Sequence, residues 1–348
     1  MSSQAKPNSS TGTNEIILAT VYFSVASIGM MTGNKVATNH LPLPSTLIIL
    51  QAVATCAPLA VSSQVIGLQK ALCVKWLPVA ALFAAMLFTS MQSFLYCTVS
   101  TILVFRNVAT ICSTVVEYFV RGKKANVQIV ASELTIIAGC VVYGWGQLGI
   151  SWLGFFWIML NVAAQVAYGN LVKVYLSTLR DDRGQELSKY TCAYYNNFLC
   201  LPFFLLTFFI WGEHNTILAN AERVSTWGWA MVVFTCVCGY CLATSGFGLQ
   251  KLVSATTFLV VNNMVKIANI LLGMVFLNDR FSSFSAAAGC IVSLGAGVWY
   301  SYEQNKLNAA PQKHVEEEVH TGGATEMKSP AEPFEICSNA TPRVPKPV

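Results

Sequence analysis

Charged side chains are scarce in this chain, where Asp, Glu, Lys and Arg make up only 11% of the 348 residues. Apolar residues make up 54%, and the mean hydropathy is +0.55. A water-facing surface needs more charge than this, so the composition excludes a soluble globular protein and indicates a polytopic membrane protein. The lead 1–14 is polar, and the first apolar run is longer than the core of a signal peptide. We therefore expect that run to remain as a spanning helix.

The motifs of membrane-bound enzymes are also missing. The sequence contains no His-Glu-x-x-His, no paired intramembrane Asp, no phosphate-binding Gly-x-x-x-x-Gly-Lys-Ser/Thr loop and no His within an apolar run. The twelve cysteines mostly stand singly in apolar runs, where Cys packs as a small hydrophobe. Cys238 and Cys241 form a lone Cys-x-x-Cys with no second pair and no His nearby. We therefore expect no enzyme, metal site, cofactor or disulfide framework.

Apolar runs of about twenty residues, the length that crosses a bilayer, recur along the chain. This pattern predicts an all-α membrane protein with ten transmembrane helices. They are placed at 15–37, 43–65, 76–96, 99–120, 127–147, 152–175, 190–212, 226–249, 254–277 and 282–302. The predicted domains are a disordered cytosolic N-terminus (1–14), a ten-helix domain (15–302) and a disordered cytosolic tail (303–348), because the tail is polar and has almost no apolar run.

The cations lie mostly on one side of these ten spans. Arg223 and Arg280 are the loop cations on the other side. Because cytosolic loops carry the excess of Lys and Arg, both termini are predicted to be cytosolic, which agrees with an even number of spans. The formal charge of +5 therefore reports topology, and no nucleic-acid partner is expected. The cations on the N-terminal side are Lys70, Lys75, Arg121, Lys123, Lys124, Lys173, Arg180, Arg183, Lys189 and Lys251.

The two halves of the chain share a weak pattern. Ala138-Gly139-Cys140 in the fifth span and Ala288-Gly289-Cys290 in the tenth lie 150 positions apart. With five spans each, halves at about 15–147 and 152–302 would be inverted relative to each other. Inverted repeats that rock about a shared midplane site are typical of transporters. The span count and the duplication disfavour a heptahelical receptor.

A polar stretch opens the seventh span. Tyr194, Tyr195, Asn196 and Asn197 lie at the start of a run that should enter hydrocarbon, where an unpaired polar group costs several kcal/mol. These side chains either satisfy one another or face a polar cavity that holds a ligand, and we favour the cavity. Carboxamides suit a base edge or sugar hydroxyls, and phenol rings can stack on a base.

Three cations in the predicted spans are candidates for a binding site, because a cation costs about 2.5 to 3.5 kcal/mol at a helix centre. They are Lys35, Arg106 and Lys266. Lys35 has the alternative of extending to the membrane interface. Arg106 has the alternative of pairing with Glu117, and Lys266 with Glu117 or Glu133. Cations in excess of acids at the centre of a bundle make an anion site.

The carboxamides Asn262 and Asn263 precede Lys266 by one helical turn and add further donors and acceptors. One ligand uses a base reader, an anion site and hydroxyl partners together. That ligand is a nucleotide joined to a sugar by a diphosphate.

The stretch Tyr194-Tyr195-Asn196-Asn197 resembles the aromatic-Tyr-Asn-Asn motif of Golgi GDP-mannose transporters, a family of nucleotide-sugar transporters in the drug/metabolite transporter superfamily. Phe105-Arg106-Asn107 is similar to their Phe-Lys-Asn, and Asn34-Lys35 with Gln51 resembles their first and second spans. In that family the Asn-Asn motif recognises the guanine nucleotide. The resemblance therefore implies that role for Tyr195, Asn196 and Asn197.

A second family motif, Gly-Ala-Leu-Asn-Lys, aligns with residues 262–266, and only Lys266 is retained. The resemblance implies a multi-pass Golgi protein that imports a GDP-sugar, with GDP-mannose leading, in exchange for GMP. GDP-fucose, GDP-arabinose or a UDP-sugar remain open, and a homodimer is left open as well. The rival is another carrier of the superfamily, for a triose phosphate or an amine, which would need no base recognition.

Overall fold

The computed structural model describes residues 9–122, 125–147, 151–180, 184, 186–253 and 255–321. Its chain divides into two units, Met1–Leu307 and Asn308–Val348. Within the described ranges every named secondary-structure element is a helix, and a single isolated β-bridge joins Arg180 to Glu186. In chain order the helices are α1 (Ser9–His40), α2 (Pro44–Ala60), α3 (Lys70–Tyr96), α4 (Val99–Arg106), α5 (Val108–Arg121), α6 (Val127–Gly146), α7 (Trp152–Thr178), α8 (Lys189–Ile210), α9 (Glu213–Arg223), α10 (Thr226–Leu252), α11 (Ala255–Phe276) and α12 (Phe284–Thr321).

The prediction of an all-helical, multi-pass membrane protein is confirmed. Eight helical segments of the described chain are long and apolar enough to cross a bilayer, and two further apolar helices, Pro44–Ala60 and Val260–Phe276, are shorter. The ends predicted to be disordered lie partly outside the described residues, at 1–8 and 322–348, while α12 continues to Thr321.

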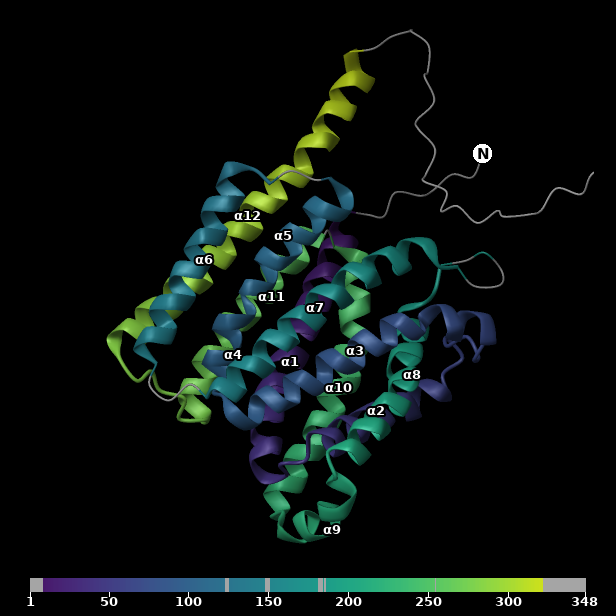
Figure 1. Ribbon diagram of the computed structural model, residues 1–348. Coiled ribbons are helices and arrows are strands. Elements are labelled where there is room, and N and C mark those ends of the chain that lie inside the picture. Colours follow the sequence, from purple (N-terminus) through teal and green to yellow (C-terminus); the bar gives the residue numbers. More distant parts are fainter. Residues whose placement is uncertain are drawn as a thin grey trace, which may run out of the picture. The chain divides into compact units, whose positions relative to one another are not determined.

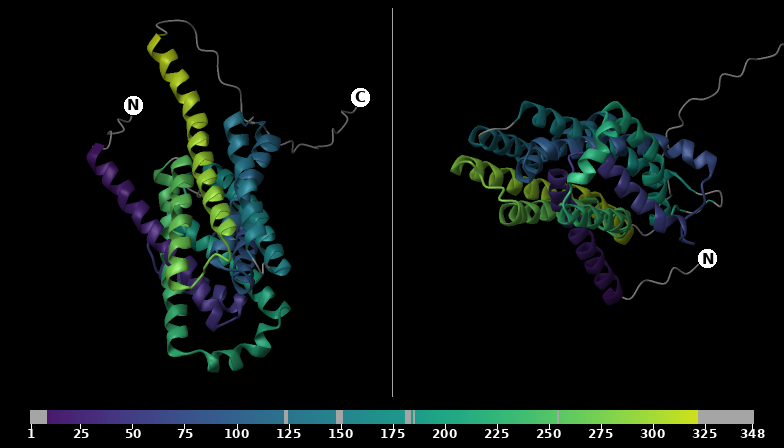
Figure 2. Two further views of the ribbon diagram at one scale, coloured as in Figure 1. Left: turned by 90° about the vertical axis from the view of Figure 1, so that its left-hand side faces the viewer. Right: turned by 90° about the horizontal axis from the view of Figure 1, so that it is seen from below.

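Two local features differ from the continuous spans predicted from the sequence. The predicted span 99–120 is broken at Asn107, which separates α4 from α5. The connection after the seventh span contains a helix, α9, which lies crosswise between the ends of α8 and α10 (Figures 1 and 2). Asn107 itself keeps helical backbone angles, with φ -64° and ψ -22°.

The helices of the two halves pack in matching pairs. In the first unit α1 packs on α10 and α3 packs on α7, and exchanging the halves converts one pair into the other. The contacts of α3 with α8 and of α10 with α2 are related in the same way, as are those of α1 with α11 and α7 with α5. These helix contacts are consistent with the pairing of the two halves predicted from the sequence.

Helices α6 and α12 approach closely at the duplicated glycines (Figure 1). A Cβ placed on Gly139 would lie 2.6 Å from the backbone nitrogen of Ser293, and one placed on Gly289 would overlap the backbone of Tyr143. Gly289 follows Gly139 by 150 positions, and Ser293 follows Tyr143 by the same interval. Each half therefore supplies the same small residue to one shared contact, as expected where membrane helices pack backbone to backbone.

Two carboxylates from the second half cap helices of the first half. Glu213, at the start of α9, accepts hydrogen bonds of 2.8 Å each from the backbone nitrogens of Ser45 and Thr46 and from the Thr46 hydroxyl. Asp279 accepts from the backbone nitrogen and the hydroxyl of Ser100, at 2.9 and 3.0 Å. A helix N-terminus exposes unpaired N–H groups and a positive dipole, so a carboxylate there stabilises both.

We expect Glu213→Ala to lower the stability of the folded chain by about 2 kcal/mol, because it leaves the buried N-terminus of α2 without its acceptor. The measurement is the midpoint of thermal unfolding in detergent. Glu222→Ala is the matched control, since Glu222 is exposed on the same helix. Equal midpoints for the two variants would contradict the capping role.

Candidate functional site

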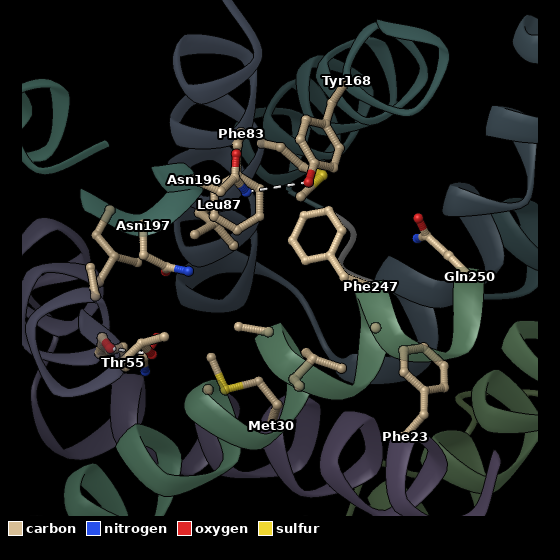
Figure 3. Close-up of a pocket in the computed structure, with 18 of the residues that line it drawn as sticks. Phe23, Met30, Thr55, Phe83, Leu87, Tyr168, Asn196, Asn197, Phe247 and Gln250 are labelled. Atoms are coloured by element: carbon tan, nitrogen blue, oxygen red, sulfur yellow. Dashed lines mark hydrogen bonds between the residues drawn. The ribbon is translucent and has the colours of Figure 1, made fainter. Parts of the chain in front are cut away.

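A cavity of about 210 Å³ lies between the helices of the first unit (Figure 3). Its walls come from α1, α2, α3, α7, α8, α10 and α11. One part of the lining is apolar and aromatic, and the remainder carries a small set of polar side chains, which is the usual composition of a ligand site. The polar lining residues are Gln51, Thr55, Tyr168, Asn196, Asn197 and Gln250.

Helix α8 delivers the two predicted carboxamides to this cavity. Its N-terminus is capped by Ser188, whose hydroxyl accepts from the backbone nitrogen of Thr191 at 3.0 Å. Two turns later Asn196 and Asn197 both line the cavity, and Figure 3 shows Asn197 directed toward its centre. Asn196 accepts from the indole nitrogen of Trp76 and donates to the Tyr168 hydroxyl, each at 3.3 Å.

The tyrosines of the same motif lie elsewhere. The Tyr195 hydroxyl accepts from the backbone nitrogen of Gln69 at 2.9 Å and donates to the carbonyl of Gly67 at 2.8 Å, so it fastens the connection between α2 and α3 to α8. The ring of Tyr194 stacks on Phe198 with ring centroids 5.5 Å apart. Neither tyrosine is among the residues that line the cavity.

Lys266 and Arg106 are each held by a polar side chain from another part of the chain. Lys266 Nζ donates to Asn107 Oδ1 at 2.8 Å, and Asn107 Nδ2 in turn donates to the hydroxyl of Ser293 at 3.1 Å. Arg106 Nη2 donates to Ser90 Oγ at 2.6 Å, and Arg106 Nε has no hydrogen-bond partner among the described residues. Lys266 is therefore bonded to the residue that directly follows Arg106 in the chain.

Within the described part of the chain, no carboxylate forms an ion pair with Arg106 or Lys266. Glu117 instead pairs with Lys173 at 3.9 Å, and Glu133 Oε1 has no hydrogen-bond partner there. The ion pairs considered for Arg106 and Lys266 are therefore not formed in this structure. Two cations without a carboxylate attract an anion, and the attraction is stronger where water is scarce.

Neither cation is among the residues that line the cavity. Arg106 Nη1 contacts Met31 Sδ at 3.8 Å, and Met31 follows the cavity residue Met30. Ser90, the other Arg106 partner, is one helical turn beyond the cavity residue Met86.

The remaining predicted site residues make structural contacts. Lys35 Nζ donates to the carbonyls of Phe94 and Cys97 and so satisfies the C-terminal end of α3. Asn263 ties α11 to α12 through the carbonyl of Gly297 and the hydroxyl of Ser301, at 2.8 and 2.7 Å. Asn262 donates to the carbonyl of Phe258 within its own helix. None of these three asparagine and lysine side chains lines the cavity.

Three residues of this region were given no role in the sequence analysis. Gln51 and Asn107 carried a signal, since each is a polar side chain inside a predicted span, and Asn107 also follows Arg106 directly. Tyr168 carried none, because a tyrosine within an apolar run has many structural uses.

Comparison with known proteins addresses the family. The model of the Triose-phosphate Transporter family matches residues 15–301. The chain belongs to this family. Among solved proteins, one crystal structure shares the fold with a TM-score of 0.51, at 14% identity over 86% of this chain and 99% of the other. A family of transporters agrees with the expectation that the chain is not an enzyme.

Several relatives of this Triose-phosphate Transporter family member are named as nucleotide-sugar transporters. These names confirm the resemblance found in the sequence. The UDP-galactose/UDP-glucose transporter 7 of Arabidopsis thaliana is 24% identical over 84% of this chain and 91% of its own length. The GDP-mannose transporter GONST3 of the same plant is 25% identical over 82% and 79%. A GDP-mannose transporter of Yarrowia lipolytica is 24% identical over 84% and 95%. The relatives named for a UDP-sugar and those named for GDP-mannose are about equally similar to this chain, at 24% to 25% identity.

Proposed function

We propose that this chain is a nucleotide-sugar antiporter that imports a GDP-sugar, most simply GDP-mannose, into the Golgi lumen in exchange for GMP. The observation that carries the proposal is a carboxamide-lined cavity in a chain that also holds two cations, Arg106 and Lys266, with no carboxylate partner among the described residues. The cavity suits a base and the cations suit a diphosphate. The names of the relatives support the same ligand class.

The proposed topology has ten spans in two inverted halves, at about 15–147 and 152–302, with both termini in the cytosol. The short apolar helix α2 and the apolar part of α11 would complete the count beyond the eight long candidates. The matching helix pairs and the shared α6–α12 contact support this arrangement. The polar ends at 1–14 and 303–348 would then lie outside the transport domain.

The proposed division of labour places base recognition at Asn196 and Asn197 and phosphate binding at Lys266 and Arg106. In this conformation Tyr194, Tyr195, Lys35, Asn262 and Asn263 make their contacts outside the cavity rather than lining it. The sugar would then be determined at the end of the site near Lys266, where residues 262–265 depart from the family motif.

A UDP-sugar exchanger is the second candidate, because a UDP-galactose/UDP-glucose transporter is as similar as the GDP-mannose transporters. A carrier of phosphorylated metabolites without a base is the third, since the family model bears the name of triose phosphate. That third candidate requires Asn196 and Asn197 to be replaceable without loss of transport.

Exchange in proteoliposomes tests the proposal. Vesicles holding the full chain and preloaded with GMP should accumulate labelled GDP-mannose, whereas empty vesicles and vesicles preloaded with UMP should not. GDP-fucose and UDP-sugars offered in parallel identify the sugar and the base. If neither GMP nor UMP drives uptake of any nucleotide sugar, the proposed function is wrong.

A further inference from the structure

Two lysines occupy matching places in the two halves. Lys35 lies five residues before the last residue of α1, His40, and Lys173 lies five residues before the last residue of α7, Thr178. A Gly-Asn pair shortly precedes each lysine, at 33–34 and at 169–170. In the proposed topology α1 and α7 are equivalent helices that end on opposite sides of the membrane. The two lysines therefore mark opposite ends of the transport domain.

Lys35 holds the C-terminus of α3. Its Nζ donates to the carbonyl of Phe94 at 2.5 Å and to that of Cys97 at 3.0 Å. The last carbonyls of a helix lack partners within the helix and form the negative end of its dipole, so an ammonium group stabilises them. Three residues after Cys97, Asp279 of the second half caps the start of α4 at Ser100. This end of the domain is therefore fastened by two charged side chains.

The C-terminus of α10 repeats the geometry of the C-terminus of α3. The residues that follow these helices, Cys97 and Val253, have φ -131° and ψ 158°, and φ -119° and ψ 159°. Each donates its backbone N–H to the carbonyl four residues earlier, at 3.0 Å. Gln250 precedes Val253 by three residues, as Phe94 precedes Cys97. The carbonyls equivalent to the two that Lys35 holds are therefore those of Gln250 and Val253.

The end of the domain at α10 is arranged differently in this conformation. Lys173 Nζ lies 3.9 Å from Glu117 Oε1 on α5, and the lysine side chain is 50% exposed. Tyr168 of α7 and Gln250 of α10 both line the cavity, and Gln250 is exposed (Figure 3). The lysine contact that fastens one end of the domain is thus replaced at the other end by an ion pair, beside an exposed part of the cavity lining.

We propose that Lys35 and Lys173 are alternating latches of the transport cycle. In this conformation Lys35 holds the end of α3, Lys173 is kept at Glu117, and the cavity is open beside Gln250. In the opposite conformation Lys173 leaves Glu117 and donates to the carbonyls of Gln250 and Val253, while Lys35 releases α3. Inverted halves exchange their conformations when a transporter changes the side to which it opens.

The latches act on the helices and leave the ligand to other residues. Neither Lys35 nor Lys173 is among the residues that line the cavity. Their alternation requires only that a transporter opens to each side of the membrane in turn. The inference therefore goes beyond the proposed function, because it holds whichever substrate is carried.

Distances at the two ends of the purified full chain report the state of the latches. One pair of fluorophores at Thr178 and Leu252, the exposed last residues of α7 and α10, measures the end beside Gln250. A second pair at Asn39 and Tyr96, exposed at the ends of α1 and α3, measures the other end. Attachment through non-natural amino acids leaves the native cysteines unlabelled. Single-molecule energy transfer then counts the two conformations with no substrate present.

Lys35→Met should favour the conformation that is closed beside Gln250, by about tenfold, because hydrogen bonds from a charged group are lost only from the conformation described. The distance between positions 178 and 252 should shorten, and that between 39 and 96 should lengthen. Lys173→Met should shift both distances the opposite way, by about fivefold, since an exposed ion pair contributes less than bonds to a helix terminus. The double variant should lie between the two single variants.

Glu117→Gln distinguishes a latch from a merely structural ion pair. It removes the partner that keeps Lys173 away from α10, so it should favour closure beside Gln250 by about threefold. That shift has the direction of Lys35→Met and is opposite to that of Lys173→Met. A structural ion pair would instead give one direction for Lys173→Met and Glu117→Gln, because both variants break the same contact.

Lys75→Met is the control for loss of a lysine, since Lys75 is exposed on α3, and it should leave both distances unchanged. Shifts in the same direction for Lys173→Met and Glu117→Gln would overturn the latch inference, as would unchanged distances in Lys35→Met. The half-exposed position of Lys173 keeps the first of these tests available if Lys35→Met does not fold. Because no substrate is present, the distances are measured whether or not nucleotide sugars exchange, so the latch inference and the proposed function fail independently.

Discussion

Lys266→Ala should reduce nucleotide-sugar exchange about 100-fold while the protein remains folded and delivered to the membrane. Lys266 and Arg106 have no carboxylate partner among the described residues, so their charge is available to a diphosphate. Truncating one member of a desolvated, hydrogen-bonded charge pair costs about 2 to 5 kcal/mol, which covers a 100-fold loss. The measurement is the initial rate of GMP-driven uptake in proteoliposomes at matched protein content.

Lys266→Gln separates charge from structure, because a glutamine side chain keeps a donor for Asn107 without the charge. We expect it to transport as poorly as the alanine variant and to unfold at the temperature of the unaltered chain. Lys75→Ala is the control for loss of a lysine, since Lys75 is exposed on α3. Normal exchange in Lys266→Gln would remove Lys266 from the phosphate site.

Gly289→Val should prevent formation of a stable folded chain. The added side chain would overlap the backbone of Tyr143, and a backbone cannot rotate away as a flexible side chain can. Overpacking a core costs about 1 to 3 kcal/mol where side chains adjust, and here α6 and α12 would have to separate. We expect loss of the monodisperse peak in size-exclusion chromatography in detergent. Gly139→Val should behave in the same way, because Gly139 meets the backbone of Ser293.

Gly295→Val carries the same substitution in the same helix. A Cβ at Gly295 meets nothing within 4 Å, and the residue is exposed. This variant should therefore retain the folded peak. If Gly289→Val and Gly295→Val gave equal yields, the contact between α6 and α12 would not be required for folding.

The helices could be predicted from the sequence because hydrocarbon imposes one rule, that backbone groups pair within a long apolar segment. All ten predicted ranges overlap helices of the structure. Helix α9 was missed because it is too polar to resemble a span. The break at Asn107 was missed because the residues on both sides of it, Arg106 and Val108, are compatible with a continuous helix.

The site was predicted less completely, for a physical reason. Composition and spacing locate polar residues within apolar runs, which is how Asn196, Asn197, Arg106 and Lys266 were found. They do not determine where each side chain is directed. Tyr195 has the same side chain as a ligand-binding tyrosine would have, yet its hydroxyl is used by Gly67 and Gln69. Gln69 and Gly67 belong to the connection between α2 and α3 and lie more than 120 positions from Tyr195 in the sequence, so the local sequence around Tyr195 does not show this contact.

The hydrogen bond from Lys266 to Asn107 has a consequence for the entropy of binding. A lysine side chain loses rotamer freedom when it grips a phosphate, and that loss weakens binding. Here Asn107 has already immobilised the ammonium group, while its own amide is held by Ser293. A neutral amide, unlike a carboxylate, cancels none of the charge of the lysine. The side chain is therefore ordered before a ligand arrives, and its neutral partner does not neutralise its charge.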